Sequence, residues 1–175
     1  MIRDMASIAS LTPMAWISLA ILVAGLAALS WIDLRTGYLP DPIQIVLAIA
    51  GLIVIGLGSP AGISWRLALA GAGINAAVFW SLRWVISRLK GREAMGLGDV
   101  KLVAVGGLWL GPWALPYIMA VGGLGTLAGT AVVSSVKRKA LWRGEMPLGP
   151  GLAAGILGCF VAALLRAPWL RLGGP

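Results

Sequence analysis

Long apolar segments recur along the entire chain, and they constrain its fold more than any other feature of the sequence. A helix needs about 20 apolar residues to span the hydrocarbon core of a bilayer. The segments that approach this length are 14–32, 42–58, 63–87, 100–115, 117–136 and 149–166. Hydrophobic residues fill 59% of the positions and charged residues 11%, a mix that a soluble domain of this size does not hide in a core. The sequence therefore predicts an all-α, polytopic membrane protein with a bundle of about six transmembrane helices.

The apolar segments also predict the domain organisation. Because they continue to the end of the chain, we expect the first one to be a retained helix and not a cleaved signal peptide. No polar stretch is long enough for a soluble domain, so we expect none before or after the bundle. Residues 1–175 are predicted to form a single membrane-embedded domain.

Basic residues in short loops predict the orientation, because such loops stay in the cytoplasm. If the N-terminus lies outside, ten basic residues fall inside: Arg35, Arg83, Arg88, Lys90, Arg92, Lys101, Lys137, Arg138, Lys139 and Arg143. The four that fall outside are Arg3, Arg66, Arg166 and Arg171. Both termini are therefore predicted outside, and the loops explain the net charge of +8 without a nucleic-acid partner. In this topology the cytoplasmic side carries Asp33, Asp41, Glu93, Asp99 and Glu145.

The residue types that are absent limit the possible chemistry. The chain has no histidine and one cysteine, Cys159, which excludes an internal disulfide, a cysteine-rich zinc site and Ser–His or Cys–His hydrolysis. We expect no metal and no cofactor, and we expect Cys159 to be a small packed hydrophobe. The acids that remain for acid–base chemistry are Asp4, Asp33, Asp41, Glu93, Asp99 and Glu145.

Asp33 and Asp99 are the most suggestive of these acids, because each lies at the edge of an apolar segment. Asp33 ends the first segment in SWIDLRTGYLPDPI, and Asp99 opens the fourth in EAMGLGDVKL. The predicted topology puts both edges at one membrane face, so side chains 66 residues apart can meet. Two carboxylates in a small site share one proton and titrate as a unit. Such a pair can hydrolyse an amide, because one carboxylate takes a proton from water while the other donates a proton to the carbonyl oxygen and the leaving amine.

A structural explanation competes with this one. A carboxylate at the interface end of a membrane helix reaches water at modest cost, and Asp99 at a helix N-terminus complements the dipole and caps free amides. Asp33 lies at a helix C-terminus, where the dipole disfavours a negative charge. Capping thus explains one aspartate and not both. Gly96 and Gly98 have no side chains, so they would let a substrate backbone approach Asp99.

Three sequence blocks carry a resemblance to a known family. IDLRTGYLPD (32–41), AMGLGDVKL (94–102) and GEMPLGPGLAAG (144–155) resemble the prepilin peptidases, which are GxGD-type intramembrane aspartic proteases. The blocks occur in the family's order, and with the helices between them the resemblance extends to nearly the whole chain.

The resemblance implies a single aspartic peptidase domain over 1–175, in the bacterial cytoplasmic (inner) membrane with its active site open to the cytoplasm. Its substrates would be type IV prepilins or pseudopilins, which lose a basic leader by cleavage after a glycine. The aspartates that match Asp33 and Asp99 are the family's catalytic pair. Longer members carry an N-terminal segment with paired CxxC motifs associated with methylation. This chain has no such segment, so the resemblance is to the compact peptidase-only form, and its size favours a tight-adherence (Flp-type) pilus.

Further residues are candidates for substrate binding or for support of the aspartates. Lys101 either stabilises the charged form of a nearby carboxylate, meets an acid on the substrate, or extends to the interface as an ordinary basic residue. Asp41 is expected to be the N-cap of the second segment, with Pro42 as first helical residue. The start of the sixth segment, where a kink could shape the substrate groove, is marked by Pro147, Gly149 and Pro150.

Two other functions remain open at this point. A small proton-coupled carrier would use the same acids as a relay, although its acid usually lies near the bilayer midplane. A catalytically silent family member would act in assembly. The expected partners are membrane lipids and a prepilin or pseudopilin whose apolar helix docks beside the bundle, because basic loops do not attract a basic leader. In the fifth segment, Gly125 and Gly129 have a GxxxG spacing that we expect to serve packing within the bundle.

Overall fold

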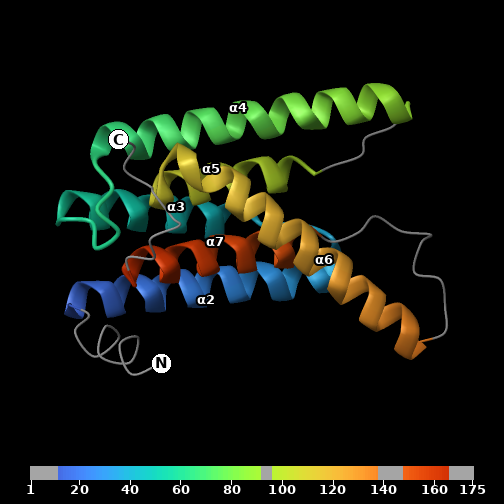
Figure 1. Ribbon diagram of the computed structural model, residues 1–175, viewed down its shortest axis with the longest axis horizontal. Coiled ribbons are helices and arrows are strands. Elements are labelled where there is room, and N and C mark those ends of the chain that lie inside the picture. The colour runs from blue at the N-terminus through green and yellow to red at the C-terminus, as the bar shows by residue number, and fades with distance from the viewer. Residues whose placement is uncertain (1–11, 92–95, 138–147, 166–175) are drawn as a thin grey trace.

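The computed structural model describes residues 12–91, 96–137 and 148–165, and Figure 1 shows that these residues form a bundle of helices. The elements are α2 (Pro13–Thr36), α3 (Asp41–Gly56), α4 (Trp65–Lys90), α5 (Leu97–Leu110), the 3-10 helix η1 (Pro112–Ala114), α6 (Leu115–Lys137) and α7 (Gly149–Leu164). The prediction of an all-α fold is confirmed over this part of the chain, and each of the six predicted segments overlaps one α-helix.

The edges of the fourth predicted segment differ most from the bounds of the corresponding helix. This segment was expected over 100–115, whereas α5 begins at Leu97 and ends at Leu110. Gly111 then takes a φ of +77°, and Pro112 starts a short 3-10 helix. Because proline lacks an N–H and clashes with the preceding turn, the α-helix cannot continue through this point.

The lengths of the helices support a protein that crosses a membrane. Within the described residues, α2 and α4 are long and apolar enough to span a bilayer, and α3 and α7 are shorter apolar helices of 16 residues each. At 1.5 Å per residue, α4 is about 39 Å long and exceeds a hydrocarbon core of about 30 Å. Large apolar side chains cover the outside of the bundle, among them Ile17, Ile45 and Leu69. The count of six spans stays a prediction.

The interior is built around α5 and α7, which contact each other and most of the other helices. In Figure 1, α7 runs beside α2, and the contacts between the two helices are extensive. Trp109 joins three helices: its Nε1 donates to the Leu47 carbonyl of α3 at 3.0 Å, and its ring meets the edge of Phe160 of α7 with centroids 5.6 Å apart. Cys159 is buried in this interior, as predicted.

Glycines bring two helix pairs close together. Gly71 of α4 lies against Gly107 of α5, and a Cβ added at either one would collide with the other's carbonyl. In the second pair, a Cβ at Gly122 of α6 would lie 3.1 Å from the Gly151 backbone of α7. The prediction that Gly125 serves this packing finds no support among the described residues, none of which lies within 4 Å of its Cβ position. The surroundings of Gly129 fall outside the described residues.

Candidate active site

The buried face of α2 directs Asp33 into the bundle. Buried positions recur every three or four residues along the helix, which is the spacing of one helical face. They are Ala15, Ser18, Leu22, Leu26, Leu29 and Asp33. Asp33 therefore continues an apolar stripe, and only 6% of its surface is exposed.

The first residue of α7 binds the Asp33 carboxylate. The Gly149 N–H donates to Asp33 Oδ2 at 3.1 Å, across 116 residues of sequence. The free N–H groups at the start of a helix carry partial positive charge and favour an anion. The start of α7 thus offsets the unfavourable dipole that Asp33 meets at the end of its own helix. A Cβ at Gly149 would lie 2.6 Å from Oδ2, so only glycine leaves room for this contact.

Asp99 occupies the third position of α5, whose N-cap is Gly96. The carboxylate accepts a hydrogen bond from the Gly96 backbone N–H, as a side chain three residues after the N-cap does in a capping box. The capping role considered for Asp99 is therefore present. Capping does not explain its burial, because Asp99 is 8% exposed and the charge of Asp33 acts on it.

The structure thus brings together the two acids that the sequence singles out. Asp33 comes from the last turn of α2 and Asp99 from the first turn of α5, and each accepts a hydrogen bond from a backbone N–H. Their carboxylates interact electrostatically in a buried setting, where burial strengthens the interaction. Two such groups favour a state in which one carboxyl is protonated and the other is charged. That state can act as acid and base on one substrate.

Gly98 lies against the loop between α2 and α3. A Cβ at this position would lie 2.8 Å from the Cβ of Leu39, a buried loop residue. At Gly96, an added Cβ would lie 3.6 Å from Asp99 Oδ2, which is an ordinary contact. The structure thus gives Gly98 a packing role, whereas the approach of a substrate at Gly96 stays a prediction.

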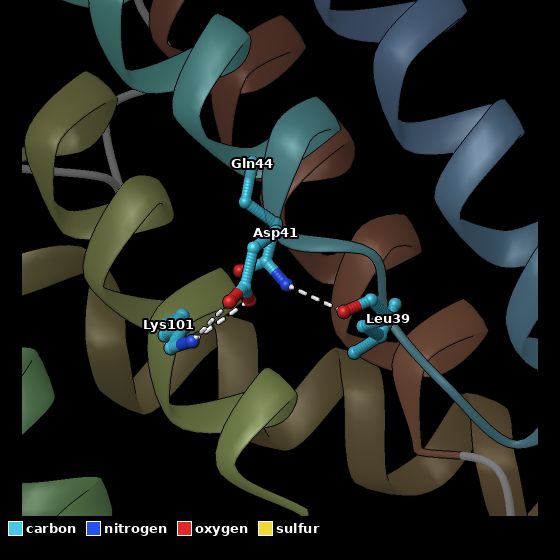
Figure 2. A network of polar contacts seen from close by, with 4 residues as sticks. All are labelled: Leu39, Asp41, Gln44 and Lys101. Atoms are coloured by element: carbon cyan, nitrogen blue, oxygen red, sulfur yellow. Dashed lines mark hydrogen bonds and ion pairs between the residues drawn. The ribbon is translucent and has the colours of Figure 1, made fainter.

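Lys101 pairs with Asp41, an acid on another helix. Its Nζ lies 2.7 Å from both carboxylate oxygens, and both side chains are about half exposed, at 51% for Lys101 and 45% for Asp41. Figure 2 shows this pair beside Gln44, whose Nε2 donates to the Leu39 carbonyl at 3.5 Å. Gln44 was not predicted, although it is the lone amide in the apolar segment 42–58.

The prediction that Asp41 caps the second segment is wrong. The helix α3 begins one residue earlier than expected, with Pro40 as N-cap and no side-chain capping bond. Asp41 is therefore the first helical residue, and its carboxylate meets Lys101 instead of the free amides. Pro42 takes the second helical position, where a missing N–H costs nothing because the first-turn amides have no partner in the helix.

Pro150 is the second residue of α7 and partly buried, and Arg35 lies over the ring of Trp31, with 4.2 Å from Cζ to the ring centroid. Within the described ranges, no three His, Cys, Asp or Glu side chains are grouped to hold a metal ion. Four of the candidate residues lie outside the described ranges: Asp4, Glu93, Glu145 and Pro147.

Comparison with known proteins gives one family. Residues 20–135 match the type IV leader peptidase family. A prepilin leader peptidase/N-methyltransferase of Burkholderia pseudomallei (strain 1026b) is 41% identical over 140 residues, which are 77% of this chain and 42% of that protein. The protein of the same name from Aeromonas salmonicida (strain A449) is 38% identical over 149 residues, or 82% of this chain and 49% of the relative. The chain thus spans less than half of these relatives. No solved structure gave a significant match.

Proposed function

The chain belongs to the type IV leader peptidase family, and on this premise we propose that it is an aspartic endopeptidase that cleaves the basic leader from type IV prepilins or pseudopilins. The observation that carries the proposal is the burial of two acids, Asp33 and Asp99, that lie close enough for the charge of Asp33 to act on Asp99. The methyltransferase activity in the relatives' names is not part of it. Processing of a tight-adherence (Flp-type) pilin stays a prediction from the sequence.

The mechanism needs only these two side chains and a water molecule. The charged carboxylate takes a proton from the water as it attacks the scissile carbonyl carbon, and the protonated one donates to the carbonyl oxygen. The acid–base roles then reverse, and a proton passes to the leaving amine. The N–H groups of Gly149 and Gly96 orient the two carboxylates without neutralising them. Lys101, two residues from Asp99, is paired with Asp41, so its charge is balanced there.

The membrane orientation follows from the basic loops. Both termini lie outside and the aspartates face the cytoplasm, because ten of the fourteen basic residues then fall inside. The substrate's apolar helix docks beside the bundle from within the membrane. Electrostatic attraction does not guide it, because the leader and the enzyme's inner loops are both basic.

The position of the acids supports hydrolysis over proton transport. A carrier usually has its acid near the bilayer midplane, whereas Asp33 and Asp99 lie in the last turn of α2 and the first turn of α5. A catalytically silent assembly factor has no need of two intact acids that meet in a buried site.

Prepilin cleavage in detergent or liposomes tests the proposal. We expect Asp33→Asn and Asp99→Asn each to lower kcat at least about 100-fold, because each removes one partner of the acid–base pair. Asp4→Asn is the matched control, since Asp4 precedes the residues that match the family. Gel filtration checks that each variant is folded. Full cleavage by Asp33→Asn or by Asp99→Asn would remove that aspartate from the mechanism.

A further inference from the structure

The Lys101–Asp41 ion pair joins the two parts of the chain that carry the candidate catalytic acids. Lys101 follows Asp99 by two residues on α5, and Asp41 follows Asp33 by eight across the loop between α2 and α3. Nζ lies 2.7 Å from both Asp41 oxygens, so the ammonium holds the carboxylate through two contacts (Figure 2). The pair is 60 residues apart in sequence, so it is a purely tertiary contact.

Two further contacts act on the same loop. Leu39, one residue before the N-cap of α3, lies against Gly98, one residue before Asp99. The amide of Gln44, which is 3% exposed, donates to the Leu39 carbonyl and so holds the loop against the first turn of α3. The loop is therefore held to α3 by Gln44 and packed against α5 at Gly98, and the ion pair joins the start of α3 to α5.

The path from one aspartate to the other runs through these contacts. The loop between Thr36 and Asp41 has only four residues, which ties the start of α3 to the end of α2, where Asp33 lies. Lys101 then ties the start of α3 to the start of α5, where Asp99 lies. We propose that the Lys101–Asp41 pair is a positioning clamp that sets the separation of Asp33 and Asp99. The catalytic part of this inference rests on the proposed function, whereas the geometric part does not.

The exposure of the pair makes a role in positioning distinct from a role in stability. Ion pairs that are about half exposed contribute little to the stability of a fold. Small displacements of reacting groups nevertheless reduce catalysis, because an acid–base pair works only in a narrow range of geometry. Loss of the clamp should therefore lower turnover in a protein that stays folded.

Steady-state cleavage of a prepilin by the full chain in liposomes tests the catalytic part. We expect Lys101→Met and Asp41→Asn each to lower kcat about fivefold, with KM changed by less than about twofold. The double variant should be no worse than either single one, because both remove the same interaction. The exchange Asp41→Lys with Lys101→Asp should restore most of kcat. Lys90→Met, an exposed lysine at the end of α4, is the matched control.

The kinetic pattern distinguishes the clamp from direct contact with substrate. If Asp41 binds the basic leader, Asp41→Asn raises KM and leaves kcat unchanged. The exchange Asp41→Lys with Lys101→Asp then does not restore KM. If Lys101 binds an acid of the substrate, Lys101→Met likewise raises KM and leaves kcat unchanged. Either result overturns the clamp, as does a loss in the double variant equal to the product of the two single losses.

A cross-linking experiment tests the geometric part without peptidase activity. On a Cys159→Ala background, Asp33→Cys and Asp99→Cys are joined by a short bis-methanethiosulfonate reagent, in which each thiol displaces one methanesulfinate, and the rate of cross-linking is measured with and without the clamp. We expect Lys101→Met to slow cross-linking several-fold, the charge exchange to restore the rate, and Lys90→Met to leave it unchanged. An unchanged rate in Lys101→Met overturns the clamp even if the chain cleaves prepilin. No cross-link in the parent contradicts the pairing of the two positions. Normal cross-linking in a chain that cleaves nothing counts against the proposed function alone.

Discussion

Gly149 donates its backbone N–H to the carboxylate of Asp33, so the first turn of α7 holds an acid that belongs to the last turn of α2. The contact puts a negative charge at a helix N-terminus, where the dipole favours it. It also explains why a glycine begins α7. The place that a Cβ would take is 2.6 Å from Oδ2 and 2.9 Å from the carboxyl carbon.

Gly149→Ala should therefore displace Asp33. We expect prepilin cleavage to fall at least about tenfold, because the methyl group pushes the carboxylate away from its place beside Asp99. Gly158→Ala is the control on the same helix, since no described residue lies within 4 Å of its Cβ position. Cleavage rates of the two purified variants decide the matter. Equal activity would mean that Asp33 acts from another position than the one held by Gly149.

The two glycines before Asp99 should differ in their tolerance of a side chain. Gly98→Ala places a Cβ 2.8 Å from that of Leu39, so we expect the first turn of α5 to shift and cleavage to fall. Gly96→Ala makes only an ordinary contact at 3.6 Å and should retain most of its activity. If Gly96→Ala is instead the more damaging change, and KM rises, the glycine serves the approach of a substrate backbone. Measurement of kcat and KM separately distinguishes the two roles.

The pairing of the aspartates is predictable from the sequence because it needs only the lengths of the apolar segments and the charges of the loops. Those two patterns predict the end of the first segment and the start of the fourth at one face, and in the structure the charge of Asp33 acts on Asp99. These patterns do not decide between capping and catalysis for Asp99. Its carboxylate accepts a hydrogen bond at the start of its own helix and also feels the charge of Asp33.

The contacts that support the pair were not predictable, because they depend on how the helices rotate against one another. Apolar segments without polar periodicity do not indicate which face of α3 meets α5, so the partner of Lys101 was left open. A shift of one residue at the start of α3 was enough to make Asp41 a partner of Lys101 and not an N-cap. For Gly125, the GxxxG spacing is present in the sequence, but within the described part of the chain no other helix packs on it.

Close packing of α4 on α5 should make Gly71 sensitive to substitution. A methyl group at Gly71 would meet the carbonyl of Gly107 and the backbone of Gly111, none of which can move without shifting α5. We expect Gly71→Ala to lower the free energy of unfolding by about 1 to 3 kcal/mol. Gly73→Ala should be neutral, because no residue in the described part of the chain lies within 4 Å of the added Cβ. Apparent midpoints of thermal unfolding in detergent, measured for both variants, test this; equal midpoints would contradict the observed helix contact.

Asn75 should be replaceable by an apolar side chain without loss of stability. It is fully buried between α4 and α5, and neither its amide nitrogen nor its amide oxygen has a hydrogen-bond partner among the residues that the structure describes. A buried polar group without partners costs about 1 to 3 kcal/mol, so Asn75→Leu, which has the same branching at Cγ, should leave the thermal midpoint equal or higher. Asn75→Ala removes volume from the same place and should lower the midpoint, because it leaves a cavity. A marked fall of the thermal midpoint in Asn75→Leu would mean that the amide binds a partner at this position, of which an internal water is the simplest.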